Sequence, residues 1–195
     1  FAMVCSLTTA MTSCSSNDDD TPQTGQLSEG DKYLQKVLAA NVDNTINPTY
    51  KALADGCEKL NNELEALTPG SITQQQVDNV CKTFLEARAN YESSEAFLLG
   101  AASHFLIDPH IDSWPLGLNE LYNYLKADHK YKITDQSILG FHGIEFILFR
   151  DGKPRKAAEL NSHDSYNQAG IDFTIFSGTQ ELDYAKAVAE DLRNS

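Results

Sequence analysis

The chain has 195 residues, which is enough for one domain with a hydrophobic core. Its hydrophobic content of 41% is ordinary for a globular protein. The net charge of −13 argues against binding to nucleic acid or to an anionic membrane surface, because both require basic patches. The acidic balance permits cation binding, although a solvated acidic surface is the simpler explanation.

The first residues are typical of a processing signal. Residues 1–11 look like the end of a secretory hydrophobic region and are too short to span a bilayer. The sequence MTSC then resembles a lipobox, in which Cys14 becomes the acylated N-terminus; an ordinary signal peptide cut nearby is the alternative. A polar run follows. We therefore expect a signal-peptide remnant over 1–13, a lipidated flexible tether over 14–30, and a helical domain over 31–195 that is truncated at its C-terminus.

Helical periodicity dominates the rest of the chain. Apolar residues at spacings of three and four predict a helix over 33–67, which Pro48 should kink or restart with Asn47 as its cap. After the turn at 68–71, Ser71 or Thr73 should cap a second helix whose pattern ends near Gly100. These two helices should form an antiparallel hairpin.

Beyond Gly100 the pattern is less regular. We expect a loop with two prolines, a short helix over 116–125, a buried helix over 138–149, a long polar loop over 153–180 with an extended piece near Phe173, and a last helix from Glu181. The fold class is all-α, an antiparallel helical bundle.

The segment 138–149 is apolar at nearly every position, which is typical of a helix buried on all sides. His142 and Glu145 interrupt it and share one helix face. An unpaired buried carboxylate is costly, so Glu145 needs a metal, a cation or a proton. Gly143 inside a helix indicates a close approach by a backbone or a ligand. A histidine and a carboxylate satisfied within the core are the structural alternative.

Other polar residues are weaker candidates. Glu95 lies near the buried stripe of the second helix, on the side of Arg88, and a structural hydrogen bond is its alternative role. Asp108 and Asp112 fall in the proline-rich loop, where carboxylates are commonly caps or turn formers. Trp114 reads as a core residue. We expect Arg150 to contact the last carbonyls of the buried helix.

Cys57 and Cys81 are the cysteines of the folded part. Both lie near the apolar stripes of the expected hairpin and nearly opposite each other across its turn. In an oxidising compartment they could form a disulfide. Two buried thiols are the alternative.

Three blocks in order, SSEAFLLG, IDSWPL and GFHGIEFILF, resemble the imelysin family of bacterial envelope proteins, and GFHGIE matches its G-x-H-x-x-E signature. The resemblance runs from about residue 33 to the end. It implies the first half of a two-bundle all-α fold and a metal site of His142 and Glu145, with Glu95 and Asp112 nearby. Relatives often carry arginine where His110 stands, which puts charge pairing there in doubt.

The function expected from these features is metal binding, of iron or alternatively zinc, in an uptake role with envelope transport components. The protein would be lipid-anchored to the outer membrane through Cys14, facing the periplasm or the cell surface, with no nucleic acid partner. A metallopeptidase using Glu145 is one alternative, since a metal can activate water. A binding protein for an organic ligand is the other. Imidazole with carboxylates does not by itself select the metal.

Overall fold

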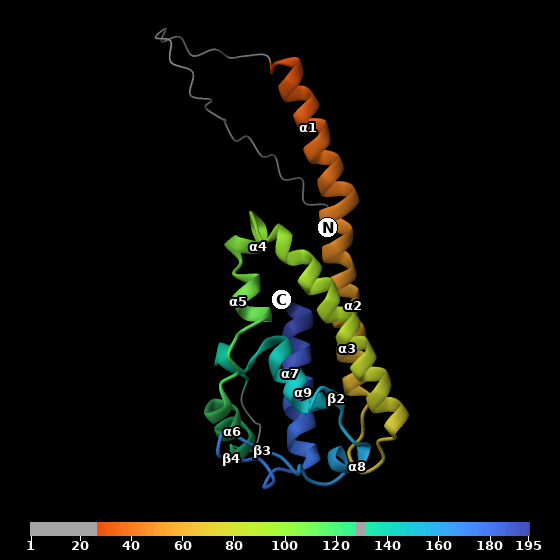
Figure 1. Cartoon of the computed structure of the whole chain (residues 1–195), viewed down its shortest axis with the longest axis vertical. Coiled ribbons are helices and arrows are strands. Elements are labelled where there is room, and N and C mark those ends of the chain that lie inside the picture. The colour runs from red at the N-terminus through yellow and green to blue at the C-terminus, as the bar shows by residue number, and fades with distance from the viewer. Residues whose placement is uncertain (1–26, 128–131) are drawn as a thin grey trace. The chain divides into compact units, whose positions relative to one another are not determined.

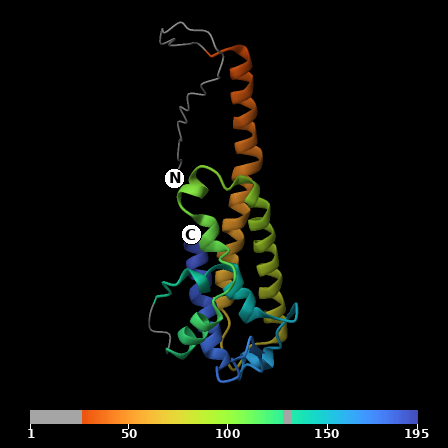
Figure 2. The ribbon, with the colours of Figure 1, turned by 60° about the vertical axis from the view of Figure 1, so that its left-hand side comes forward.

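The structure is a computed structural model and describes residues 27–127 and 132–195. The chain divides into two compact units, residues 1–37 and residues 38–195, and the second holds the hydrophobic core. Figures 1 and 2 show the elements, whose order and bounds are as follows. They are α1 (Glu29–Asn41), the π-helix η1 (Val42–Ile46), α2 (Asn47–Glu65), α3 (Gln74–Ser94), the 3-10 turn η2 (Glu95–Phe97), α4 (Ala101–His104), α5 (Ile107–Ile111), α6 (Leu118–Lys126), the 3-10 turn η3 (Gln136–Ile138), α7 (Gly140–Leu148), β1 (Phe149–Arg150), β2 (Lys153–Pro154), α8 (Ala157–Leu160), β3 (Asn167–Gln168), β4 (Ile171–Asp172) and α9 (Gly178–Asn194).

The all-α bundle is confirmed. Helices α2 and α3 form the expected antiparallel hairpin, α9 packs against α2, and α7 packs against both α9 and α3 (Figures 1 and 2). Two antiparallel hairpins of two-residue strands, β1–β2 and β3–β4, decorate the connections. Within the described residues no helix is both long enough and apolar enough to cross a membrane.

The first two helices begin and end close to where the sequence places them. Thr73, rather than Ser71, caps α3, and its side chain forms a capping box with Gln76. Pro48 lies in the first turn of α2, whose cap position is Ile46 rather than Asn47. The π-helix before it is where the hydrogen-bonding pattern adjusts, because proline offers no N–H to the preceding turn. No residue of α1 is buried, and it begins at Glu29, inside the segment expected to be tether.

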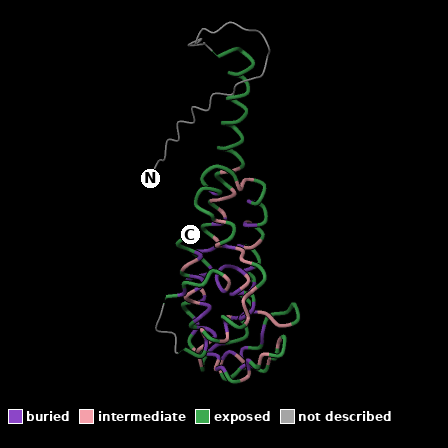
Figure 3. The backbone as a smooth tube through the Cα atoms, turned by 90° about the vertical axis from the view of Figure 1, so that its left-hand side faces the viewer, coloured by how far each residue is buried: buried purple, intermediate pink, exposed green. Residues whose placement is uncertain are grey.

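Burial follows the apolar stripes in the second unit (Figure 3). Helix α7 is enclosed on most sides, as expected: seven of its nine residues are buried. Two aromatic contacts fix it against α3, since the ring of Phe141 lies 5.7 Å from the rings of both Phe84 and Tyr91. The segment 153–180 contains less loop than expected, because α8 and the β3–β4 hairpin form within it.

The two cysteines are free thiols. Cys57 and Cys81 are both buried, and burial raises the pKa of each thiol to about 12. The thiol of Cys81 lies 3.6 Å from the carbonyl oxygen of Leu148 in α7. The disulfide considered above is therefore absent from the structure, and the alternative of two buried thiols is observed. Each thiol packs as a small apolar group.

A cluster of four ionisable side chains, three of them buried, closes the C-terminal end of α7, and sequence reasoning missed it. Arg150 contacts Asp164, and Arg155 lies 3.0 Å from Glu181 and 3.4 Å from Asp164. Arg150 also donates to the carbonyls of Phe146 and Phe149, as expected for a cation at a helix end. The cluster links α7, the segment before α8, the segment before β3, and α9.

Arg155 should be the most sensitive member of this cluster. Its side chain is fully buried and also donates to the carbonyl of Ile147 at 3.0 Å. Arg155→Ala would leave two buried carboxylates short of a partner, and we expect it to lower the free energy of unfolding by about 3–5 kcal/mol. Lys153→Ala, on the exposed β2 strand, is the matched control and should change it by less than about 0.5 kcal/mol. Equal urea midpoints for the two variants would contradict a structural role for the cluster.

The cluster should also make stability depend on pH. Burial, and then the neighbouring Asp164, raise the pKa of Glu181 from 4.5 to about 8. Between these values the folded protein holds a proton that the unfolded chain has released, so its stability falls as pH rises through this window. Glu181→Gln, which resembles the protonated acid, should remove this dependence. Urea unfolding at about pH 5 and about pH 8 tests it, and an unchanged pH dependence in the variant would contradict the assignment.

Candidate functional site

The His142–Glu145 pair lies on the edge of α7 that the bundle does not cover. The Nδ1 atom of His142 lies 3.2 Å from the Oε2 atom of Glu145, so the i, i+3 spacing aligns them as predicted. The His142 side chain is 16% exposed, but that of Glu145 is 51% exposed. The expectation that Glu145 is buried was wrong. The carboxylate lies at the one edge of α7 where its charge stays solvated.

Asp112 completes a row of three groups. It follows the last residue of α5, and its Oδ1 atom lies 3.1 Å from the Nε2 atom of His142. The ring of His142 therefore has a carboxylate at each nitrogen, Asp112 on one side and Glu145 on the other. A neutral imidazole is a donor at only one nitrogen. Of these two contacts, the one between Nδ1 and Glu145 is a hydrogen bond, and Nε2 faces Oδ1 of Asp112 without one.

Arg88 of α3 balances the charge of Asp112. Its Nη1 atom lies 2.9 Å from Oδ1 of Asp112, and its Nε atom donates to Glu92 at 2.8 Å. The hydrogen bond from His142, with further help from the charges of His142 and Arg88, holds the pKa of Glu145 below its ordinary value. Glu145 is thus a carboxylate at neutral pH. Arg88 was considered a partner of Glu95, but it pairs with Glu92 and Asp112 instead.

Glu95 does not join the row. It is exposed, in the turn η2 after α3, and no hydrogen bond or ion pair joins it to His142 or Glu145 in the part of the chain that the structure describes. Partial desolvation, followed by the carboxylates of Glu92, Asp112 and Asp108, raises the pKa of Glu95. Asp108 of the same region accepts a hydrogen bond from the buried Tyr91. Glu95 therefore belongs to the acidic rim around the site.

Gly140 allows α5 to approach α7 closely enough to bring Asp112 to His142. Its φ angle is +77°, and a Cβ atom there would overlap the backbone carbonyl of Ile111, the residue before Asp112. Gly143 serves a second close contact. A Cβ atom there would overlap the hydroxyl of Tyr184, which donates to the carbonyl oxygen of Ile138 at 2.5 Å. The close approach predicted at Gly143 is confirmed, and the neighbours are protein groups.

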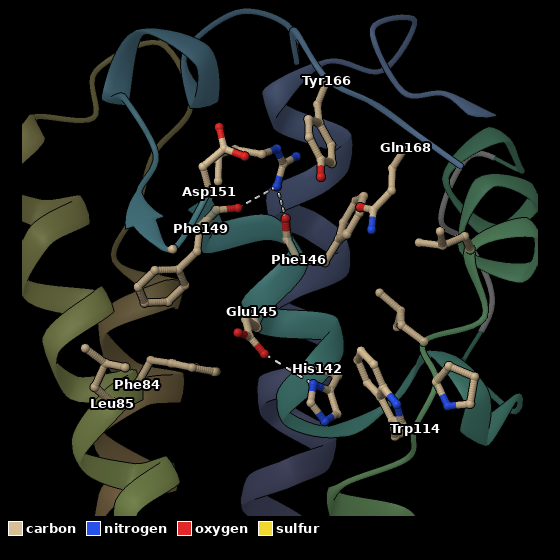
Figure 4. A pocket seen from close by; sticks show the side chains of 15 residues that line it. Phe84, Leu85, Trp114, His142, Glu145, Phe146, Phe149, Asp151, Tyr166 and Gln168 are labelled. Carbon is tan, nitrogen blue, oxygen red and sulfur yellow. Dashed lines mark hydrogen bonds and ion pairs between the residues drawn. The ribbon is translucent and has the colours of Figure 1, made fainter. Parts of the chain in front are cut away.

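A pocket of about 580 Å³ opens beside the pair. Figure 4 shows His142 between Glu145 and the indole of Trp114, whose ring centroid lies 4.5 Å from that of the imidazole. Apolar side chains such as Phe149 line much of the rest of the pocket, together with Tyr166 and the polar Arg150, Asp151 and Gln168. Trp114 is 72% exposed, so its expected place in the core was wrong. The sequence analysis did not predict this pocket, because its lining comes from segments far apart in the chain.

Two further predicted residues, Cys14 and His110, are not part of the row. Cys14 lies outside the described residues. His110 pairs with Asp191 of α9, at 2.7 Å between Nε2 and Oδ2, so a contact with an acid forms where charge pairing was in doubt. In the parts of the chain that the structure describes, no group of three or more His, Cys, Asp and Glu side chains is arranged to hold a metal ion. Among the described residues, His142, Glu145, Glu95 and Asp112 are therefore not gathered into one such group.

Comparison with known proteins identifies the family of the chain. The family model described as Imelysin matches residues 46–195, which includes α2 to α9 and the His142–Glu145 pair. The chain belongs to the imelysin family. Its match to the family covers the hairpin, the buried α7 and all three blocks seen in the sequence.

Two relatives of this imelysin-family chain carry the same name. Iron-regulated protein A of Synechococcus elongatus is 27% identical over 119 residues, which are 61% of this chain and 33% of that protein. A crystal structure of a protein named as an iron-regulated protein A precursor, from Parabacteroides distasonis, superposes with a TM-score of 0.70 at 26% identity. That match covers 88% of this chain and 45% of the other. The chain thus spans a third to a half of the length of these relatives.

Gly140 provides a test of how the site is positioned. Gly140→Ala should cost about 1–2 kcal/mol for its left-handed backbone, and the overlap with Ile111 should add about 1–3 kcal/mol. Gly152→Ala is the matched control, because Gly152 also has a positive φ but nothing lies within 4 Å of its Cβ position. Urea unfolding measures both. A loss no larger at Gly140 than at Gly152 would show that the α5–α7 contact does not constrain the site.

Proposed function

We propose that this imelysin-family chain is a metal-binding protein of the cell envelope that handles iron, with His142 and Asp112 as two of the metal ligands. The observation that carries the proposal is the 3.1 Å separation between Nε2 of His142 and Oδ1 of Asp112. Imidazole nitrogen and carboxylate oxygen bind metals such as zinc at about 2.0–2.2 Å. Two adjacent ligand atoms on one ion are then about 3 Å apart, which is the separation found here.

The burial of Asp112 supports this fit. Its Oδ1 atom is buried and has no hydrogen-bond partner of good geometry, although Arg88 and His142 both lie nearby. A buried carboxylate oxygen without a hydrogen bond is costly. A metal ion bound there would satisfy both this oxygen and Nε2 of His142. Arg88 supplies the compensating charge when no ion is bound, and it would compete with one.

Glu145 takes a different part in this proposal from the one the sequence suggested. It contacts Nδ1, the ring nitrogen that faces away from Asp112. Metal-binding histidines usually donate their other N–H to a carboxylate, which fixes the ring and makes it a better ligand. We therefore propose that Glu145 orients His142. Ligands beyond His142 and Asp112 would come from water or from outside the described residues.

The proposal of iron rests on the names of the relatives, and the proposal of an envelope location rests on the sequence. Both relatives are named iron-regulated, and mixed imidazole and carboxylate ligands suit iron, manganese and zinc. The proposed location is the envelope, with Cys14 as the lipid anchor and membrane transport components as partners in iron uptake. Durable anchoring by lipid needs more than one acyl chain, which lipoprotein processing would supply.

The second candidate is a metallopeptidase, favoured by one observation, the open pocket beside His142 and Glu145. In that case a metal would activate water, and Glu145 would act on the proton of that water. Cleavage of an unfolded substrate by the metal-loaded chain, lost in Glu145→Gln, would favour this candidate over a binding role.

The metal ligands can be tested by binding to chelator-stripped protein. Isothermal titration with Fe²⁺ without oxygen, and with Zn²⁺ and Mn²⁺, should show binding that His142→Ala and Asp112→Ala abolish. Glu145→Gln should bind about 10–100-fold more weakly, since it loses only the orienting contact. Arg88→Gln should bind more tightly, because a competing cation is removed.

Glu95→Gln is the matched control, an exposed acid at the rim that should leave affinity unchanged. Circular dichroism checks that each variant remains helical. Metal binding that survives in both His142→Ala and Asp112→Ala would overturn the site. Complete loss in Glu145→Gln would restore Glu145 as a ligand.

A further inference from the structure

The pocket beside Glu145 has the size and walls of a site for a small organic molecule. Its volume of about 580 Å³ lies within the range of 300–1,000 Å³ that is typical of such sites. The rings of Trp114, Phe146, Phe149 and Tyr166 contribute to its lining, together with polar side chains such as Glu145 and Gln168. Figure 4 shows Glu145 between Phe149 and His142, at the middle of this lining.

The lining of the pocket carries more acids than arginine or lysine side chains. Its acids are Glu145 and Asp151, and its cation Arg150 contacts Asp164 and backbone carbonyls. Only Oε2 of Glu145 is used in the contact with His142, so within the described residues Oε1 has no hydrogen bond. A ligand with a positive charge would therefore be preferred to a neutral or anionic one.

The aromatic rings of the pocket are of two kinds: a cationic side chain of the protein already lies over some of them, and over others it does not. The guanidinium of Arg150 lies 4.8 Å from the ring centroid of Phe146 and 4.4 Å from that of Tyr166. Trp114 has no such partner among the described residues, and 72% of it is exposed beside the imidazole of His142. Tryptophan is the best ring for a cation–π contact. Trp114 thus offers an exposed aromatic ring in the same pocket lining as the carboxylate of Glu145.

We propose that this pocket binds an organic cation, an amine or quaternary ammonium group on an aromatic or aliphatic body, with Glu145 as counter-ion and Trp114 as the stacking surface. The ligand body lies against Phe149 and the apolar lining. The proposal does not require a bound metal ion, so it stands or falls separately from the metal-binding function.

Trp114 makes the test direct, because it is the single tryptophan of the chain. Its fluorescence therefore reports on this pocket alone. The metal-free full chain is titrated with three probes of similar size, 2-phenylethylammonium, neutral 2-phenylethanol and anionic phenylacetate. The cation should give a saturable blue shift as the exposed indole is covered. The neutral and anionic probes should bind at least about tenfold more weakly, which corresponds to about 1.4 kcal/mol.

Two variants separate charge from shape. Glu145→Gln keeps the size of the side chain and should abolish the preference for the cation, so that 2-phenylethylammonium and 2-phenylethanol bind alike. Glu58→Gln, an exposed acid on α2 outside the pocket lining, is the matched control and should keep the full preference. The Trp114→Ala variant lacks the fluorophore, so its binding of the cation is measured by calorimetry. Binding should be at least about tenfold weaker, as expected for loss of a stacking and cation–π surface.

The outcomes are distinct from those of the metal titrations, because all of these samples contain chelator. Equal affinity for charged and neutral probes in the unsubstituted chain would overturn the proposal, as would tighter binding of phenylacetate. So would the absence of saturation, or a cation preference that survives Glu145→Gln. Failure here together with metal binding at His142 and Asp112 would leave the proposed function intact.

Discussion

The burial of α7 is the constraint on which the rest of the structure depends. With seven of nine residues buried, this helix can carry polar side chains only where the bundle leaves an edge open, and His142 and Glu145 occupy that edge. The same burial requires the helix to approach its neighbours without side chains at Gly140 and Gly143. The close contact at Gly140 brings the backbone next to Asp112 against the helix. The row of Asp112, His142 and Glu145 is therefore a consequence of how α7 packs, and its geometry should be as rigid as the core beneath it.

The buried charges at the other end of α7 serve a different purpose. Arg155, Asp164 and Glu181 come from three separate segments, and none of them could be stable in the interior alone. Together they fix the irregular segment between β2 and α9, which lacks the apolar periodicity that would otherwise specify its position. Such a cluster adds specificity more surely than stability, because desolvation offsets much of the attraction between its charges. Arg150 belongs to this cluster and also lines the pocket, so the cluster helps to determine which charges the pocket presents.

Periodic segments could be predicted from the sequence, and contacts between distant segments could not. The stripes of α2 and α3, the presence of a last helix and a cap at Ser71 or Thr73 are local properties, so the sequence could predict them. The spacing of His142 and Glu145 likewise fixed their alignment, but not their exposure, because exposure depends on which edge of α7 its neighbours leave uncovered. Trp114 was expected in the core, although its surroundings are set by the packing of α5 against α7. The charge cluster was invisible because its members are spread over residues 150–181 with no shared motif.

Glu145 lies where the two proposed sites meet. Its Oε2 atom contacts Nδ1 of His142, and its carboxylate also faces the pocket lined by Trp114 and Phe149. A cation in the pocket would partly neutralise the carboxylate of Glu145, which would then polarise the imidazole of His142 less. His142 would become a weaker ligand for a metal ion on Nε2. Linkage is reciprocal, so a metal ion would weaken the organic cation by the same factor. Occupation of the two sites would then be antagonistic without any movement of the bundle, because a single carboxylate supplies the coupling.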